Sequence, residues 1–199
     1  MIHSNVSEYF DLKVAKYGKS HRSVGYFSEF TQQLRFLVLA SGLNWEPMDT
    51  VLDVGCGLGD LVGFCQKEGY LCKYRGIDVS PQMIALAEDT FGEGLFEVGD
   101  FMAEGYQPCV DFTVGSGVAN VEVPNAIVEA KRLIEKGFLV SRKGCAFNFL
   151  STLTPGADRK SQMTYFDPIE MAMFCFTLTP NVVLKHDYLP NDFTVFLMK

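Results

Sequence analysis

The sequence predicts an α/β fold in which one mostly parallel sheet carries helices on both faces. Apolar runs typical of strands alternate with segments whose apolar residues recur at helical spacing, and this alternation indicates βαβ units. The chain has 199 residues, enough for a single domain with a full core. Its last two apolar runs, 182–189 and 192–199, are separated only by Pro190 and Asn191, which predicts an antiparallel hairpin.

The helices are predicted from their end signals as well as from their periodicity. Ser28 is placed to cap the first of them and Gly42 to end it, while Ser80 and Pro81 open a later helix and Asp167 opens the last. In chain order we expect a helix over 28–42, a strand over 50–54, a helix over 60–68, a strand over 73–78, a helix over 81–91, strands over 95–100 and 111–117, a helix over 124–143, a strand over 145–151 and a helix over 167–178.

The charge balance argues against a nucleic acid as the main partner. The net charge is −7 and the pI about 4.9, whereas a phosphate-binding surface normally needs a basic stripe. Five basic residues do lie close together in the sequence, but a solvated helix face accounts for them better than a binding patch. They are Lys131, Arg132, Lys136, Arg142 and Lys143.

We expect a cytoplasmic protein with no membrane span and no metal site. No run reaches the roughly 18 apolar residues of a membrane helix, and the first residues lack the apolar segment of a signal peptide. The six cysteines are scattered without a C-x-x-C pair, so we interpret them as reduced thiols. None of the three histidines has the spacing to cysteine that zinc ligands show.

The stretch "VLDVGCGLGD", residues 51–60, suggests a nucleotide-like ligand that carries no phosphate. The dinucleotide pattern G-x-G-x-x-G fails here: counted from Gly55 the third glycine would be Asp60, and counted from Gly57 it would be Val62. A pyrophosphate at this helix start would also meet the carboxylate of Asp60. S-adenosylmethionine has adenosine but carries a sulfonium and an ammonium, both positive, so carboxylates around a glycine turn suit it.

Three further positions fit this ligand. Asp78 ends the second strand, where an acid can accept hydrogen bonds from both ribose hydroxyls. Asp100 and Phe101 follow the third strand, where a carboxylate can accept from the adenine amino group and an aromatic ring can pack on the base. All of these positions lie at the carboxyl ends of predicted parallel strands, the edge at which open α/β sheets bind ligands.

With these residues in view, the chain resembles the class I S-adenosylmethionine-dependent methyltransferases. The segments "VLDVGCGLGD", "YRGIDVSPQMIALAE", "FEVGDF" and "DFTVGSGVAN" are similar to successive motifs of that family, and the resemblance runs from about residue 28 to the hairpin. It implies a Rossmann-like sheet of seven strands, the last antiparallel. The cofactor-binding residues that we predict are Arg35, Asp53, Gly55, Cys56, Gly57, Asp78, Val79, Met83, Asp100, Phe101 and Ser116.

The sequence says less about the methyl acceptor than about the cofactor. Family members that methylate base amino groups carry an N/D/S-P-P-aromatic run after the fourth strand, but this chain has "GSGVAN" there, and it lacks a catechol-type cluster of acids for magnesium. We therefore expect a small O-, N- or C-methyl acceptor. A nicotinamide-dependent oxidoreductase and a non-catalytic S-adenosylmethionine-binding protein are the alternatives.

Three regions could close over the cleft: the N-terminal segment, residues 148–161 and the hairpin segment 186–192. We divide the chain into a lid segment, 1–27, and a methyltransferase domain, 28–199; a frayed terminus is the alternative to a lid. Arg35 is a candidate for the cofactor's carboxylate, although a surface role is equally compatible. Acceptor candidates are Tyr17, Asn120 and Asn148, and acid–base candidates are His186 and Tyr188, for which hairpin packing is the simpler interpretation.

Overall fold

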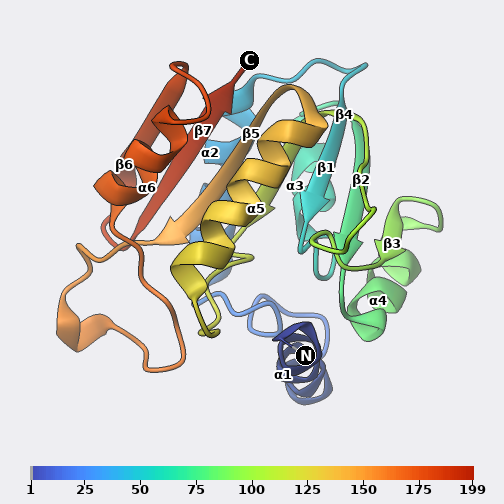
Figure 1. Ribbon diagram of the computed structural model, residues 1–199. Helices are drawn as coiled ribbons and strands as arrows, with labels where there is room; N and C mark the ends of the chain where they lie inside the picture. The colour runs from blue at the N-terminus through green and yellow to red at the C-terminus, as the bar shows by residue number, and fades with distance from the viewer. Residues whose placement is uncertain (1) are drawn as a thin grey trace.

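A seven-stranded sheet with the strand order β3-β2-β1-β4-β5-β7-β6 forms the centre of the molecule (Figure 1). The computed structural model describes residues 2–199, and the side chains of all of these except 2–5 and 157. Strands β1 to β5 pair in parallel, and β7 runs antiparallel to both β5 and β6, so the predicted fold and hairpin are confirmed. The strands are β1 Thr50–Val54, β2 Lys73–Asp78, β3 Phe96–Val98, β4 Val110–Ser116, β5 Ser141–Leu150, β6 Val182–Leu189 and β7 Asp192–Met198.

Helices cover both faces of this sheet. They are α1 Ile2–Tyr17, α2 Glu29–Leu43, α3 Asp60–Glu68, α4 Pro81–Phe91, α5 Ala126–Val140 and α6 Pro168–Phe176, with a short 3-10 turn at Gly156–Asp158. Figure 1 shows α5 and α6 in front of the sheet and α2 and α3 behind it. Because successive strand residues point to opposite faces, the core divides into two clusters. Phe112 and Ala146 face α2 and α3, whereas Cys145 and Phe147 pack under α5.

The predicted helix caps are present. Ser28 Oγ accepts the Thr31 N–H at 3.2 Å, and Ser80 Oγ accepts the Met83 N–H at 3.1 Å. Asp167 accepts two N–H groups of the first turn of α6. Each cap satisfies backbone donors that the helix leaves free, and is worth about 1 kcal/mol.

Predicted boundaries were wrong at the end of α2, at the end of α5 and at the start of β5, which begins at Ser141 rather than at residue 145. Gly42 does not end α2, which runs to Leu43. A Cβ at Gly42 would lie 2.3 Å from the Phe196 ring, so this glycine serves close packing of α2 on β7. Helix α5 ends at Val140 rather than at residue 143, because Ser141 is extended and pairs with Val110 at the start of β5.

The helix α1 was not predicted. It lies beyond the end of the sheet, beside α4 (Figure 1). A small cluster holds it there: Phe10 and Val14 pack with Leu58 and Met83, and Ser80 Oγ donates to Asp11 Oδ1 at 2.5 Å. Met1, the first residue of the expected lid segment, lies outside the described residues.

Candidate active site

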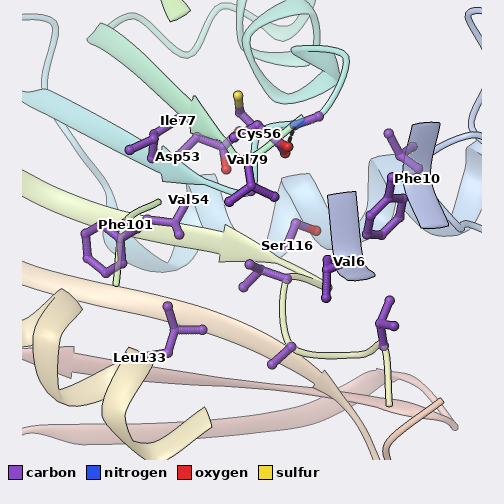
Figure 2. A pocket seen from close by; sticks show the side chains of 18 of the residues that line it. Val6, Phe10, Asp53, Val54, Cys56, Ile77, Val79, Phe101, Ser116 and Leu133 are labelled. Carbon is purple, nitrogen blue, oxygen red and sulfur yellow. Dashed lines mark hydrogen bonds between the residues drawn. The ribbon is translucent and has the colours of Figure 1, made fainter. Parts of the chain in front are cut away.

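A cavity of about 180 Å³ lies at the carboxyl ends of β1, β2 and β4, and we call it the first cavity. The glycine turn that follows β1 forms part of its wall. In Figure 2, Asp53 and Cys56 lie near this turn, Val6 and Phe10 of α1 close one side, and Phe101 closes the opposite side. The parallel strands thus bring residues from distant parts of the sequence to one edge of the sheet, as predicted.

The glycine turn can only be built from glycine. Gly55 and Gly57 have φ of +68° and +54°, in the left-handed region that side chains rarely adopt. A Cβ at Gly55 would lie 2.8 Å from Val118 Cγ2, and one at Gly57 would lie 2.8 Å from Val24 Cγ1. The space next to each glycine is therefore filled by a valine side chain of the cavity lining, and one of these, Val24, belongs to the N-terminal segment.

Asp53 and Asp60 place carboxyl groups on this wall. Asp53 is almost fully buried, and its Oδ2 accepts a hydrogen bond from the Tyr74 hydroxyl at 2.8 Å. Burial raises the pKa of Asp53 to about 7, against the hydrogen bond from Tyr74, which lowers it. Asp60 accepts from Gln32 Nε2 at 2.7 Å, and burial raises its pKa as well. A cation in the cavity would favour the ionised form of both groups.

Asp78 is held in place by two backbone donors. Its Oδ2 accepts the Gly57 N–H and its Oδ1 accepts the Ser80 N–H, each at 2.9 Å. Burial raises the pKa of Asp78, and these N–H groups oppose that rise. Each carboxylate oxygen can accept more than one hydrogen bond, so capacity remains for a ligand's hydroxyl groups.

Asp100 and Phe101 line the same cavity. Asp100 Oδ1 accepts the Met102 N–H at 2.8 Å, which turns the chain after β3. The Phe101 ring is buried, lies edge-on to Tyr106 and has the Lys136 ammonium 5.2 Å from its centroid. Of the other predicted cofactor residues, Cys56, Val79, Met83 and Ser116 also line the first cavity.

A second cavity, of about 410 Å³, adjoins the first. Five residues line both: Phe10, Val24, Tyr26, Gly117 and Val121. All three regions expected to close over the cleft contribute to it, namely the N-terminal segment, the loop after β5 and the hairpin turn.

Arg35 is not at the first cavity, where we had placed it. Its guanidinium forms two hydrogen bonds to the carboxylate of Asp192, of 2.8 and 2.7 Å, and both side chains are buried. The guanidinium also lies 4.8 Å from the centroid of the Tyr26 ring. Arg35 instead lines the second cavity, with its charge already matched by Asp192. Sequence spacing could not show this pair because 157 positions separate its members.

The acid–base candidates lie in the hairpin and line neither cavity. His186 Nε2 is 2.7 Å from Ser151 Oγ, and its ring stacks on Phe193. The Tyr188 hydroxyl is 2.9 Å from Thr194 Oγ1, and burial raises its pKa. This arrangement fits hairpin packing.

The acceptor candidates have different surroundings. Asn120 lines the second cavity. Asn148 is fully buried, and its Oδ1 accepts the Gly117 N–H at 2.8 Å while its Nδ2 donates to Ser116 Oγ at 3.1 Å, so it positions the turn after β4. Tyr17 lines neither cavity and is partly exposed, with the Lys16 ammonium 5.1 Å from its ring centroid.

Tyr26 is a site residue that sequence reasoning offered only as one of several possible ligand contacts in the N-terminal segment. Its hydroxyl lies 2.6 Å from Ser116 Oγ and donates to the Ser116 carbonyl at 3.1 Å. Burial raises the pKa of Tyr26 to about 12, although Arg35 opposes the rise, so the phenol stays protonated at neutral pH. The sequence signal was a group of aromatic residues before the first strand, which indicated a cover with several possible ligand contacts but gave no reason to prefer Tyr26.

Comparison with known proteins decides the family. Residues 51–137 match the methyltransferase domain family. Rv1506c of Mycobacterium tuberculosis (strain ATCC 25618 / H37Rv), whose name assigns it to the methyltransferases, is 30% identical over 155 residues, which make up 75% of this chain and 93% of that protein. The chain belongs to the S-adenosylmethionine-dependent methyltransferases. S-adenosylmethionine is its cofactor, as predicted, and the oxidoreductase alternative is set aside.

Solved methyltransferase structures share the fold. Magnesium protoporphyrin IX methyltransferase (ChlM) from Synechocystis PCC 6803, with bound S-adenosylhomocysteine, superposes with a TM-score of 0.65 at 16% identity and full coverage of both chains. The plantazolicin methyltransferase BpumL, in complex with a triazolic desmethylPZN analog and S-adenosylhomocysteine, gives 0.63 at 15% identity, covering 100% of this chain and 99% of that one.

The described residues of the methyltransferase provide neither a metal-binding cluster nor a membrane-spanning helix. Among the described residues, no group of three or more His, Cys, Asp or Glu side chains is arranged to hold a metal ion. Across residues 2–199, no helix has the length and apolar character needed to cross a membrane.

Proposed function

We propose that this methyltransferase binds S-adenosylmethionine in the first cavity and methylates a small molecule held in the second. The observation that carries the proposal is the shared wall, because the two ligands of a methyl transfer must meet at near-contact distance. When bound, S-adenosylmethionine would supply a methyl group: an acceptor atom would bond to the methyl carbon as the carbon–sulfur bond breaks, and its electron pair would stay on sulfur in the leaving S-adenosylhomocysteine. Any proton on the acceptor leaves to solvent.

The residues of the first cavity fit this cofactor. The Asp78 carboxylate, fixed by two N–H groups, accepts hydrogen bonds from the ribose hydroxyls. Asp100 and Phe101 receive the adenine, and Gly55 and Gly57 add no side chain of their own to the cavity. Asp53, buried behind the turn, offers a negative charge to a positively charged ligand.

The N-terminal segment acts as the cover of this site. Phe10, Val24 and Tyr26 all come from it, and all line both cavities. The segment is held by the small apolar cluster of α1, by hydrogen bonds from Ser80 to Asp11 and from Tyr26 to Ser116, and by an ion pair of 2.6 Å between Lys19 and Asp89. Both side chains of that ion pair are well exposed, so it adds little to this anchoring. A cover that orders over the ligands excludes water from the reacting atoms.

Several observations support a small acceptor in the cytoplasm. Of the five clustered basic residues, four form ion pairs, to Glu170, Glu129, Asp111 and Asp49, which leaves little charge for a nucleic acid. ChlM and BpumL are named for the compounds protoporphyrin IX and plantazolicin. All six cysteines are free thiols, which suits a reducing compartment.

Calorimetry with S-adenosylmethionine, S-adenosylhomocysteine and NAD tests the cofactor assignment. We expect dissociation constants on the order of micromolar for the first two and no binding of NAD. Tight binding of NAD alone would contradict the assignment.

A labelling experiment tests the acceptor. Cell extract is incubated with the enzyme and methyl-labelled S-adenosylmethionine, and ultrafiltration then separates small molecules from macromolecules. Chromatography of the filtrate separates unreacted S-adenosylmethionine, and an enzyme-dependent labelled product is expected in this small-molecule fraction. Label confined to protein or nucleic acid would refute a small acceptor.

A further inference from the structure

We propose that the second cavity selects an uncharged, planar aromatic acceptor and that Asn120 donates a hydrogen bond to it. This inference rests on the proposed function and adds the chemical class of the acceptor. Five aromatic side chains from three segments of the chain line this cavity: Tyr9, Phe10, Tyr26, Phe27 and Tyr165. Aromatic walls favour flat aromatic ligands, because pairs of rings attract one another beyond the area they bury.

The charges around the second cavity cancel. Arg35 is bound to Asp192 by two hydrogen bonds, and both are buried, so drawing Arg35 to a ligand would leave the Asp192 carboxylate without its partner. The remaining charged residues in the lining, Asp158 and Lys160, have opposite signs. A cavity with no net charge gives no advantage to an acidic or basic acceptor.

Phe27 marks the mouth of the second cavity. Its side chain is 83% exposed although it belongs to the lining, and the Lys160 ammonium lies 5.8 Å from its ring centroid. A large apolar ring left in water beside a cavity offers a surface that a ligand can cover. Phe30, three residues on, is 71% exposed but lines neither cavity, so it provides a matched comparison.

Asn120 supplies the polar contact. Its Oδ1 accepts the Leu150 N–H at 3.2 Å, and this bond fixes which end of the amide is the nitrogen. The Nδ2 end lies 3.1 Å from the point where a Cβ on Gly117 would stand, and Gly117 belongs to the wall between the two cavities. Among the described residues, no group accepts a hydrogen bond from Asn120 Nδ2. The donor is therefore available to an oxygen or nitrogen atom of the acceptor, next to the cofactor.

Coumarin is a suitable probe because it is flat, uncharged and accepts hydrogen bonds without donating them. Octahydrocoumarin keeps the carbonyl but has no aromatic ring, and coumarin-3-carboxylate adds a negative charge. Each is titrated into the protein by calorimetry, with and without saturating S-adenosylhomocysteine. We expect coumarin to bind with a dissociation constant below about 1 mM. We expect it to bind about fivefold more tightly than octahydrocoumarin, and no less tightly than the carboxylate.

Single substitutions in and beside the second cavity show where coumarin binds. Phe27→Ala should weaken coumarin about fivefold, whereas the matched Phe30→Ala should leave it unchanged. Asn120→Asp keeps the oxygen that accepts from Leu150 but removes the donor, and should weaken coumarin about tenfold. Affinity for S-adenosylhomocysteine should be unchanged in both Phe variants, which shows that they fold and keep the first cavity.

The inference is overturned if coumarin shows no binding in this range, if octahydrocoumarin or the carboxylate binds better, or if the Phe27 and Phe30 variants behave alike. Displacement of S-adenosylhomocysteine by coumarin would overturn it too, because the probe would then occupy the first cavity. Failure of S-adenosylhomocysteine itself to bind would instead contradict the proposed function. The titrations without it would still decide whether the second cavity prefers aromatic ligands.

Discussion

Replacing Asp78 by asparagine tests the cofactor site more sharply than replacing it by alanine. From sequence alone the asparagine variant is expected to be mild, because an amide oxygen still accepts hydrogen bonds. In the structure, however, both carboxylate oxygens already accept N–H groups, from Gly57 and from Ser80, each at 2.9 Å. Asparagine has one oxygen only, so its NH₂ group would face one of these donors at hydrogen-bond distance.

The structure gives the size of the expected effect. One charge-assisted hydrogen bond is lost, a contribution of about 1.5–3 kcal/mol, and one N–H donor is left without an acceptor. We therefore expect Asp78→Asn to lower the free energy of unfolding of the ligand-free protein by about 2 kcal/mol. Its affinity for S-adenosylmethionine should fall about tenfold to a hundredfold, close to the loss in Asp78→Ala, since the glycine turn loses its anchor along with the ribose contact.

Urea unfolding measures the first quantity and calorimetry the second. Asp187→Asn is the control, because it also removes one carboxylate but from an exposed position that pairs with Lys185, away from both cavities. It should leave affinity for S-adenosylmethionine unchanged. A folded Asp78→Asn protein that binds the cofactor within about twofold of the wild type would refute the reasoning.

Two further predictions concern pH and the cover. Burial raises the pKa of Asp53 to about 7 from 3.8, so the folded state holds this proton more tightly; that contribution to stability is complete below about pH 4 and is lost as pH rises through about 7. As Asp53 ionises, affinity for S-adenosylmethionine should rise up to about tenfold between about pH 6 and pH 8. An equal slope in Asp53→Asn would contradict this. In hydrogen exchange, S-adenosylhomocysteine should protect residues 9–27; protection confined to 53–59 would rule out a cofactor-gated cover.

The parts of the fold that sequence predicted well are those set by local signals. The caps at Ser28 and Ser80 depend on residues three positions apart, and the glycine turn depends on a strand and a helix that follow one another. Helix α1 depends on the opposite kind of contact. It has few apolar contacts of its own, and its bond from Ser80 to Asp11 joins positions 69 residues apart. Such a helix gives a weak periodic signal because tertiary contacts stabilise it.

The same distinction between local signals and long-range contacts explains which residues of the candidate site could be predicted. Asp78 and Asp100 could be placed from sequence because Asp78 ends β2 and Asp100 follows β3, and the ends of parallel strands meet at one edge of the sheet. The partner of Arg35 could not, because Asp192 reaches it only through the pairing of the C-terminal hairpin with the sheet. A cation placed from sequence has a known charge but unknown partners, and the partners decide whether it is available to a ligand.

The second cavity shows why the acceptor was the hardest feature to predict. It has no strand-end motif. Its walls come from α1 and the segment after it, the turn after β4, the loop after β5 and the hairpin turn. Tyr26 joins these parts to the cofactor site, since its hydroxyl bonds to Ser116 and its ring lies beneath Arg35. Because the same segment completes both cavities, the conformational entropy lost when it orders over the cofactor is not lost again when the acceptor enters.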